Sequence, residues 1–183
     1  MKRITTPEME LLIYEYFEKS SHVIVPKFSR INTVKYKDKT KHLGYRSEKI
    51  VTHECDMLAV TKNKFLYEIE IKISVSDFKA DFKKKHNHEG NIKQFYYAVP
   101  YYILDKIEDL VPEETGILIA ECNDDNFNKS WKLKKYKNAK NNKLATPIDD
   151  EKLNKIFRIG YLKYWFYRKK EYYNLSQVTK INR

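Results

Sequence analysis

Two short segments of the chain carry acidic and basic residues at a spacing that suits metal-dependent chemistry. Residues 53–60 contain Asp56, and residues 67–74 contain Glu70 and Lys72. Alternate side chains of an extended strand share a face, so Glu70 and Lys72 point the same way, opposite the isoleucines between them. An isolated pattern of this kind is also typical of a half-solvated strand with its charges in water. The preceding segment is needed to decide between the two readings.

The register between the two segments favours a site. A three-residue hairpin loop at 62–64, with Asn63 in the left-handed region, predicts three cross-strand pairs. These pairs are Asp56 with Glu70, Glu54 with Lys72, and Val60 with Leu66. The shared face is then apolar at its turn end and charged at the other, whereas a solvated face would be polar throughout. A two-residue loop would place Asp56 opposite Ile69 and destroy the site.

Two converging carboxylates resist joint ionisation unless a divalent cation neutralises them. Hard oxygen ligands suit Mg²⁺, with Mn²⁺ as an alternative, and Asp56, Glu70 and the backbone carbonyl of Ile71 are the predicted ligands. Such an ion polarises a phosphoryl oxygen and makes a bound water more acidic. Lys72 on the same face can stabilise the developing negative charge or help to deprotonate the water.

The surrounding sequence predicts the elements that hold these residues. Helical spacing and strand-like runs, bounded by Pro, Gly and capping residues, indicate helices alternating with strands. Helices are expected at 5–19, 76–85 (capped by Ser76 and Asp77), 103–110 and from 153 onward, and strands at 23–25, 50–60, 65–74, 94–99, 116–121 and 131–136. Residues 27–49 hold eight basic and two acidic residues and are expected to form a basic loop or an irregular hairpin. Residues 123–147 read as an exposed connection.

This order predicts one α/β domain over residues 1–183, with a mixed central sheet flanked by helices and a long C-terminal helix. A basic and aromatic extension covers about 125–183. Lys and Arg number 36 against 25 Asp and Glu, so a polyanionic partner is favoured, with nucleic acid ahead of an anionic membrane surface. Biased codon usage is the alternative origin of this charge. Neither a signal peptide nor a membrane span is expected, and the predicted location is cytoplasmic.

The motif and its neighbours resemble the PD-(D/E)XK nuclease superfamily, and within it the DNA-repair-related MmcB-like family. Four blocks in order carry the likeness in addition to the Asp56 segment: residues 70–74, 77–83, 95–100 and 111–120. Together they span roughly residues 55–121. The resemblance implies a restriction-endonuclease-like core in which helices bracket the strands of the motif.

The resemblance also implies roles for individual residues. Asp56 and Glu70 would bind the metal, and Lys72 would be the catalytic lysine. A glutamate of the first helix often adds a ligand in this superfamily, and Glu10 is the candidate, with Glu8 or Glu15 as substitutes. Contacts to DNA are expected from four further residues: Lys79, Lys83, Lys84 and Gln94.

The leading hypothesis is a Mg²⁺-dependent DNA endonuclease acting in repair, recombination or the processing of phage and mobile-element DNA. The second is a DNA-binding protein that keeps the nuclease fold with little or no catalysis. A third is a phage or mobile-element protein whose basic surface captures another acidic macromolecule. Homodimerisation is left open, because many nucleases of this type are dimers while no segment of this sequence indicates an interface.

Overall fold

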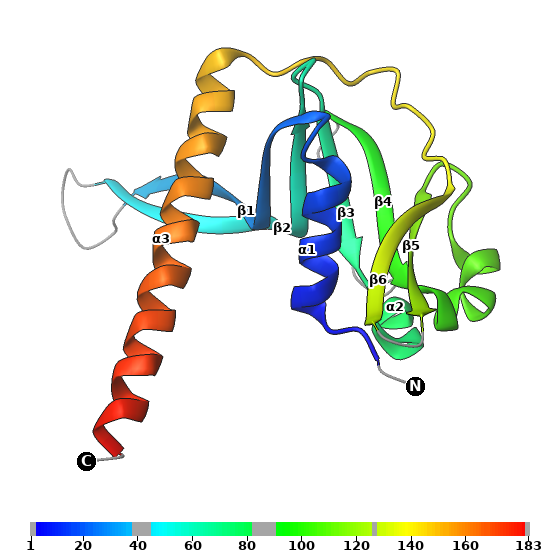
Figure 1. Ribbon diagram of the computed structural model, residues 1–183. Helices are drawn as coiled ribbons and strands as arrows, with labels where there is room; N and C mark the ends of the chain where they lie inside the picture. The colour runs from blue at the N-terminus through cyan, green and yellow to red at the C-terminus, as the bar shows by residue number, and fades with distance from the viewer. Residues whose placement is uncertain (1–2, 38–44, 82–90, 126–127, 182–183) are drawn as a thin grey trace.

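A mixed six-stranded sheet lies at the centre of the part of the chain that the computed structural model describes, residues 3–37, 45–81, 91–125 and 128–181. The helices and strands follow one another as α1 (Thr6–Phe17), β1 (Ser21–Lys37), β2 (Tyr45–Thr61), β3 (Leu66–Ile71), α2 (Val75–Asp81), β4 (Ile92–Pro100), the 3₁₀ helices η1 (Tyr101–Lys106) and η2 (Glu108–Leu110), β5 (Gly116–Asp125), β6 (Asn128–Lys137) and α3 (Asp150–Ile181). Figure 1 shows α1 against the sheet and α3 leading away from it. The predicted α/β class is confirmed.

The strands lie side by side in chain order, β1-β2-β3-β4-β5-β6. β1, β2 and β3 form an antiparallel meander, β3, β4 and β5 are parallel, and β6 is antiparallel to β5 at the far edge. Parallel neighbours require crossover connections. α2 lies on the crossover from β3 to β4, and η1 and η2 lie on the crossover from β4 to β5. The strand that carries the motif is therefore central in the sheet.

α1 covers one face of the sheet and begins where the sequence predicts. Thr5 is its N-cap and forms a capping box with Glu8, and Pro7 lies in the first turn. Its buried side chains pack against the isoleucines of β3 and their neighbours in one core cluster. The members that α1 contributes are Met9, Leu12, Ile13 and Phe17. This packing fixes which face of β3 is left for the charged residues.

The opposite face is covered in two places. The first turns of α3 bury Leu153 and Ile156 against Leu58, Val60 and Leu66 at the turn end of β2 and β3. Phe78 of α2 packs with the 3₁₀ segment and with β4 and β5 in a separate cluster. The charged residues of β3 lie on this same face, because successive side chains of a strand point to opposite faces, and both faces of β3 are covered.

The hairpin turn between β2 and β3 confirms the predicted loop length. Thr61 donates its N–H to the carbonyl of Phe65 at 2.9 Å, so residues 62–64 form the loop, and Val60 pairs with Leu66 as expected. The left-handed residue is Lys64, with φ of 60°, and the expectation for Asn63 is wrong. A three-residue loop of this class places the left-handed conformation at its last residue.

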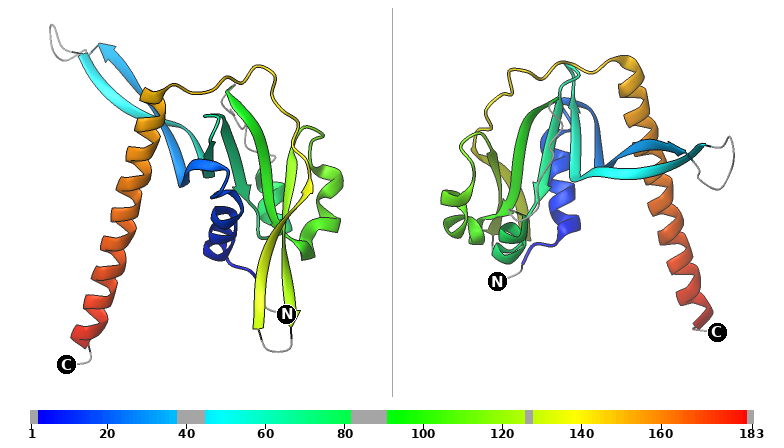
Figure 2. Two further views of the ribbon diagram at one scale, coloured as in Figure 1. Left: turned by 45° about the horizontal axis from the view of Figure 1, so that its top comes forward. Right: turned by 180° about the vertical axis from the view of Figure 1, so that it is seen from behind.

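β1 and β2 bend away from the rest of the sheet and continue as a two-stranded arm that crosses α3 (Figures 1 and 2). Lys27 and Asp56 lie at the bend, between the pairs Pro26–Met57 and Phe28–Cys55, and Lys27 has a positive φ of 47°. Of the two readings for residues 27–49, the irregular hairpin is correct for 27–37 and 45–49. The loop reading is wrong there because both strands continue, with a register shift after Arg30. Residues 38–44 lie outside the described part of the chain.

Other boundaries differ from the predicted ones. The α2 helix is capped by Ser74 rather than by Ser76 and Asp77, since the N–H of Asp77 donates to the Ser74 hydroxyl at 3.2 Å. Residues 82–85 of the predicted helix are not among the described residues. The segment 103–110 is 3₁₀ rather than α-helical. The strand expected at 131–136 is confirmed as β6, which is longer and takes 128–137 of the predicted connection. Among described residues, no helix is both long and apolar enough to cross a membrane.

The start of β5 has no room for a side chain at Gly116. An added Cβ would lie 2.8 Å from the backbone nitrogen of Ala139 and closer still to the buried Tyr96 ring. We expect Gly116→Ala to lower the free energy of unfolding by about 1–3 kcal/mol, because overpacking must move backbone. Thermal unfolding followed by circular dichroism should then shift down by roughly 3–10 °C.

Gly160→Ala is the matched control for that substitution. Its Cβ would meet only the ends of two side chains, Val25 at 3.3 Å and Val23 at 3.9 Å, and helix propensity favours alanine by about 1 kcal/mol. An equal loss of stability in both variants would contradict the packing described at Gly116.

Candidate active site

A cluster of buried charged side chains lies at the carboxyl end of β3. Glu68, Glu70 and Lys72 share the face opposite α1, and each is 5% exposed or less. Lys72 follows the last residue of the strand, but its N–H still donates to the carbonyl of Ala98 at 3.0 Å, which keeps it aligned with β4. Buried charges are costly unless they are paired, so their partners define the site.

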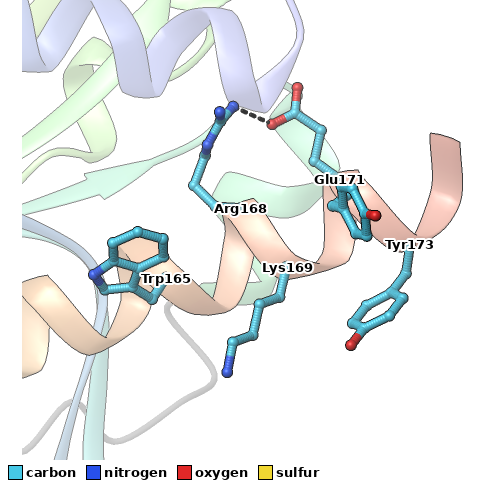
Figure 3. Close-up of a pocket in the computed structure, with 6 residues that line it drawn as sticks. Trp165, Arg168, Lys169, Glu171 and Tyr173 are labelled. Carbon is cyan, nitrogen blue, oxygen red and sulfur yellow. Dashed lines mark hydrogen bonds and ion pairs between the residues drawn. The ribbon is translucent and has the colours of Figure 1, made fainter. Parts of the chain in front are cut away.

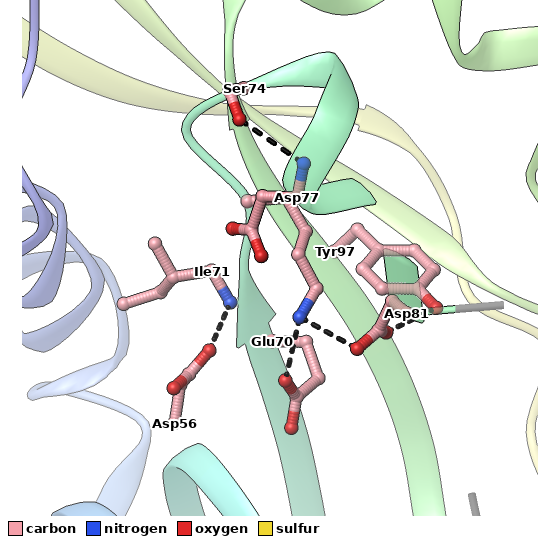
Figure 4. A network of polar contacts seen from close by, with 8 residues as sticks. Asp56, Glu70, Ile71, Ser74, Asp77, Asp81 and Tyr97 are labelled. Atoms are coloured by element: carbon pink, nitrogen blue, oxygen red, sulfur yellow. Dashed lines mark hydrogen bonds and ion pairs between the residues drawn. The ribbon is translucent and has the colours of Figure 1, made fainter. Parts of the chain in front are cut away.

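Lys72 is held between two carboxylates (Figure 4). Its ammonium donates to Asp81 at 2.9 Å and to Glu70 at 3.2 Å. The Tyr97 hydroxyl donates to the other oxygen of Asp81 at 3.1 Å. Burial disfavours the charged lysine, but the hydrogen bonds and negative charges of Asp81 and Glu70 outweigh it, so the pKa of Lys72 is raised. The site therefore contains a lysine that keeps its proton.

Glu70 is the least satisfied member of this cluster. Its Oε1 atom is buried and, within the described residues, has no hydrogen-bond partner, while Oε2 shares Lys72 with Asp81. Burial, followed by the negative charge of Asp56, raises the pKa of Glu70 to about 8 even though Lys72 acts in the opposite direction. The charge of buried Glu68 adds a further small increase. A second positive charge beside Glu70 would favour its ionised form and lower its pKa.

Asp56 lies at the bend of β2, next to Glu70. Pairing between β2 and β3 ends at Met57 with Ile69, and the Asp56 carboxylate then accepts the N–H of Ile71 at 2.8 Å (Figure 4). The predicted proximity of Asp56 to Glu70 is thus present. The predicted pair of Glu54 with Lys72 is wrong, because the bend carries Glu54 away to accept a hydrogen bond from Ser29 at 3.1 Å.

Of the three glutamates of α1, the structure brings Glu10 nearest to this cluster. Burial, partly offset by Lys27, raises the pKa of Glu10, and the charge of Asp56 raises it further. Glu8 is engaged in the capping box at Thr5, and Glu15 is exposed.

The two described residues that were expected to contact DNA, Lys79 and Gln94, lie on different elements. Lys79 is exposed on α2, two residues before Asp81. Lys83 and Lys84 lie outside the described residues. Gln94 projects with Tyr96 to the α1 side of the sheet, where its amide donates to Asn141 at 2.9 Å and accepts from the Tyr96 hydroxyl at 2.8 Å. The fold therefore separates Gln94 from Glu70 and Lys72.

Asp81 and Tyr97 are members of the cluster that sequence reasoning missed. Asp81 is 1% exposed and is the closest partner of Lys72. The charge pattern gave no reason to select it, but its position three residues after Phe78 places both on the buried face of α2. Burial, followed by the charge of Asp81, raises the pKa of Tyr97, so its hydroxyl remains a donor.

The carboxylates of the cluster suit a divalent cation, but the described side chains alone do not complete its set of ligands. No three His, Cys, Asp or Glu side chains within the described ranges are placed to hold a metal together. Asp56 and the unpaired oxygen of Glu70 nevertheless offer the two hard ligands that Mg²⁺ uses when water and phosphate complete its shell. A cation would also remove the repulsion that raises the pKa of Glu70.

The state of Glu70 has a measurable consequence for stability. The pKa of Glu70 in the folded protein, about 8, lies above its ordinary value of 4.5. The stability that the protonated carboxyl contributes is therefore fully present below about pH 4.5 and is lost as the pH rises through 8. We expect the free energy of unfolding, measured with urea in EDTA, to fall by a few kcal/mol over that range. Glu70→Gln should flatten this part of the profile.

Glu113→Gln is the control for the pH profile, because Glu113 is a surface residue paired with Lys140 and its pKa is lowered. It should leave the decline between about pH 4.5 and 8 in place. A Glu70→Gln profile parallel to the wild type would show that Glu70 is not buried as described.

The fold and the cluster define the class of protein: an α/β domain whose central strand presents buried carboxylates and a charged lysine at its carboxyl end. A family model described as DNA repair protein MmcB-like matches residues 50–155, more than half of the chain. The protein therefore belongs to the MmcB-like DNA repair family. The match runs from β2 to the first turns of α3 and includes every residue of the cluster.

One solved structure shows a similar fold over nearly the whole chain. A protein of unknown function from Silicibacter pomeroyi aligns with a TM-score of 0.55, covering 93% of this chain and 92% of that one. The two sequences are 16% identical, so the similarity is one of fold. No curated protein matches the sequence.

Proposed function

We propose that this protein is a Mg²⁺-dependent DNA endonuclease that hydrolyses phosphodiester bonds at the Asp56–Glu70–Lys72 cluster. The observation that carries the proposal is the buried Glu70 carboxylate, which lies beside Asp56 and a protonated lysine and has one oxygen with no partner among the described residues. Strongly shifted ionisable groups with specific partners are typical of functional sites. The order of elements also agrees with the resemblance to PD-(D/E)XK nucleases, since α1 and α2 bracket the strands of the motif.

Mg²⁺ bound by Asp56 and Glu70 would supply a polarised phosphoryl oxygen and a more acidic water. The side chains of the protein would provide the remaining charge stabilisation and a further acidic group. Lys72 keeps its proton because Asp81 holds it, so it is suited to stabilise developing negative charge rather than to act as a base. Glu10 lies near enough to Asp56 to serve as a further acidic group.

DNA is the proposed substrate on two grounds. The chain carries a formal net charge of +11, which favours a polyanion. The family to which it belongs is one of DNA repair. Cleavage within a repair, recombination or mobile-element process follows from combining these grounds with the cluster.

The proposal is tested by incubating the protein with supercoiled plasmid and with branched DNA in Mg²⁺, Mn²⁺ or EDTA. We expect nicking or linearisation with either metal and none with EDTA. Cleavage that persists in EDTA, or that survives replacement of Asp56 by asparagine, would count against this site.

A second candidate function is DNA binding without cleavage. Two observations favour it: the Asp56 carboxylate already accepts the Ile71 N–H, and Lys72 is closed between Glu70 and Asp81. In that case the wild type should bind DNA with steep salt dependence and show no metal-dependent cleavage on any substrate.

A further inference from the structure

The C-terminal helix extends far beyond the core that it covers. α3 spans Asp150–Ile181, a length of roughly 48 Å at 1.5 Å per residue. Leu153 and Ile156 are buried, and Gly160 packs on β1 near Val25. Beyond that point every described side chain up to 173 is exposed, apart from the half-exposed Lys163. Both views of Figure 2 show the helix projecting from the sheet.

The projecting part is rich in exposed aromatic rings. Four consecutive residues, Tyr164 to Tyr167, carry rings that are 42–65% exposed, and because successive residues are about 100° apart these rings surround the helix. Further exposed rings are those of Tyr161, Tyr172 and Tyr173. An amphipathic membrane helix would gather its apolar side chains on one face. The distribution on α3 is different.

The same segment is strongly basic. Between residues 152 and 170 the sequence has seven Lys and Arg residues and no Asp or Glu. Glu171 follows, and it pairs with Arg168 at 2.8 Å. Two copies of this helix brought together would repel each other, whereas a polyanion would be attracted. The charge therefore favours nucleic acid over a second copy of the chain.

Two hollows combine these features. One has a volume of about 370 Å³ and lies along the helix between Trp165 and Tyr173, with Arg168 and Lys169 in its lining (Figure 3). The other has a volume of about 760 Å³ and lies between β1 and α3, where Pro26 faces Tyr161 and Tyr164. Each places aromatic faces beside cationic groups, together with the Glu171 carboxylate that pairs with Arg168.

The second hollow lies beside the segment of β1 that precedes Lys27. Lys163, in its lining, donates a hydrogen bond to the carbonyl of Lys27. Lys27 lies at the bend of the hairpin together with Asp56, between the same two cross-strand pairs. A ligand in this hollow would thus lie near the part of the hairpin that carries Asp56.

We propose that residues 161–173 of α3 form a binding arm for single-stranded DNA, on which unpaired bases stack and whose basic residues hold the phosphates. Stacking on aromatic side chains requires unpaired bases, because the faces of paired bases are covered by their neighbours in the duplex. The arm deepens the proposed function by naming its substrate class, DNA with a single-stranded stretch. Its test uses binding rather than cleavage, so the two proposals can fail separately.

The test measures binding of the full chain to fluorescein-labelled oligothymidine and to a duplex of equal length, in EDTA, by fluorescence anisotropy. Trp165→Ala should weaken binding of the oligothymidine by about 5- to 100-fold, and should weaken binding of the duplex much less. Trp165→Phe keeps an aromatic face and should recover most of the affinity. Arg168→Ala with Lys169→Ala should weaken both ligands and reduce the salt dependence.

Tyr136→Ala is the matched control, since Tyr136 is a 52% exposed ring among lysines on edge strand β6. It should leave the affinity for oligothymidine unchanged. Tyr172→Ala with Tyr173→Ala is a second variant in the arm, and circular dichroism checks that each variant folds. The proposal would be overturned if Trp165→Ala weakened binding of oligothymidine and duplex equally, or if Tyr136→Ala weakened binding of oligothymidine as much as Trp165→Ala does. A Trp165→Ala variant with a changed oligomeric state and unchanged DNA affinity would also overturn it.

Discussion

Replacing Glu70 with glutamine is expected to reduce Mg²⁺-dependent cleavage of plasmid DNA by roughly 10³-fold. The change removes a negative oxygen ligand, and a metal contributes several kcal/mol to stabilising charge in the transition state, with each 1.4 kcal/mol worth about tenfold in rate. Glutamine has nearly the same shape, and Glu70 has a pKa of about 8, so it is largely neutral at pH 7 without metal. Folding and DNA affinity in EDTA should therefore be preserved.

The rate should be measured as initial nicking of supercoiled plasmid at saturating Mg²⁺, with wild type and Glu113→Gln beside it. Glu113 is exposed and paired with Lys140 on the surface, so its loss should leave the rate within a factor of two or so of the wild type. A Glu70→Gln enzyme that retains more than about a tenth of the wild-type rate would place the metal elsewhere.

Breaking the pair of Lys72 with Asp81 is expected to cost about 3–5 kcal/mol of the free energy of unfolding. Lys72→Met takes the ammonium away from the buried Asp81 carboxylate, and Asp81→Leu takes away the nearer of the two carboxylates that hold the buried Lys72 ammonium. Urea unfolding at pH 7, followed by circular dichroism, should show a lower midpoint in both variants. For a chain of this size the thermal midpoint should fall by roughly 10 °C.

The double variant Lys72→Met/Asp81→Leu separates the cost of an orphaned charge from the value of the pair. Replacing both partners with apolar side chains is often neutral or stabilising, so the double variant should be more stable than either single one. Additive losses would mean that the two residues are not coupled. Losses of about 1 kcal/mol or less would mean that water reaches the cluster.

Sequence reasoning predicted the pairing of β2 with β3 from local information. The length of the turn at 62–64 sets which residues face each other, and an apolar end with a charged end on one strand face indicated a buried site. The structure confirms the pair of Val60 with Leu66 and the proximity of Asp56 to Glu70. It does not extend the ladder to Glu54, because β2 bends at Asp56.

That bend could not be predicted from the sequence. Lys27 adopts a positive φ although it is neither Gly nor Asn, so its identity gives no signal for the left-handed conformation. The outer parts of β1 and β2 also lack a clear alternation of apolar residues. The predicted basic loop was therefore wrong within the described residues, and the irregular hairpin was the correct alternative.

The positions of the Asp81 and Gln94 side chains relative to the site also could not be predicted from the sequence. Which side of a short helix is buried depends on how it packs, and Asp81 became part of the cluster because Phe78 turns that side of α2 toward β4. Gln94 lies in β4, beside the strand that carries the motif, but strand alternation directs it with Tyr96 to the α1 side. Proximity in sequence did not translate into proximity in space.

The sequence alone predicted that Asp56 of β2 lies close to Glu70 of β3, and that Glu70 and Lys72 share a face, because turn length and strand alternation are local properties. The sequence also determined the α/β class and the basic character of the protein. Only the tertiary structure decided that Lys72 is shared with Asp81, that one Glu70 oxygen has no partner within the described ranges, and that the aromatic rings of α3 are exposed. These depend on how distant segments pack, and burial sets the energy of each charge.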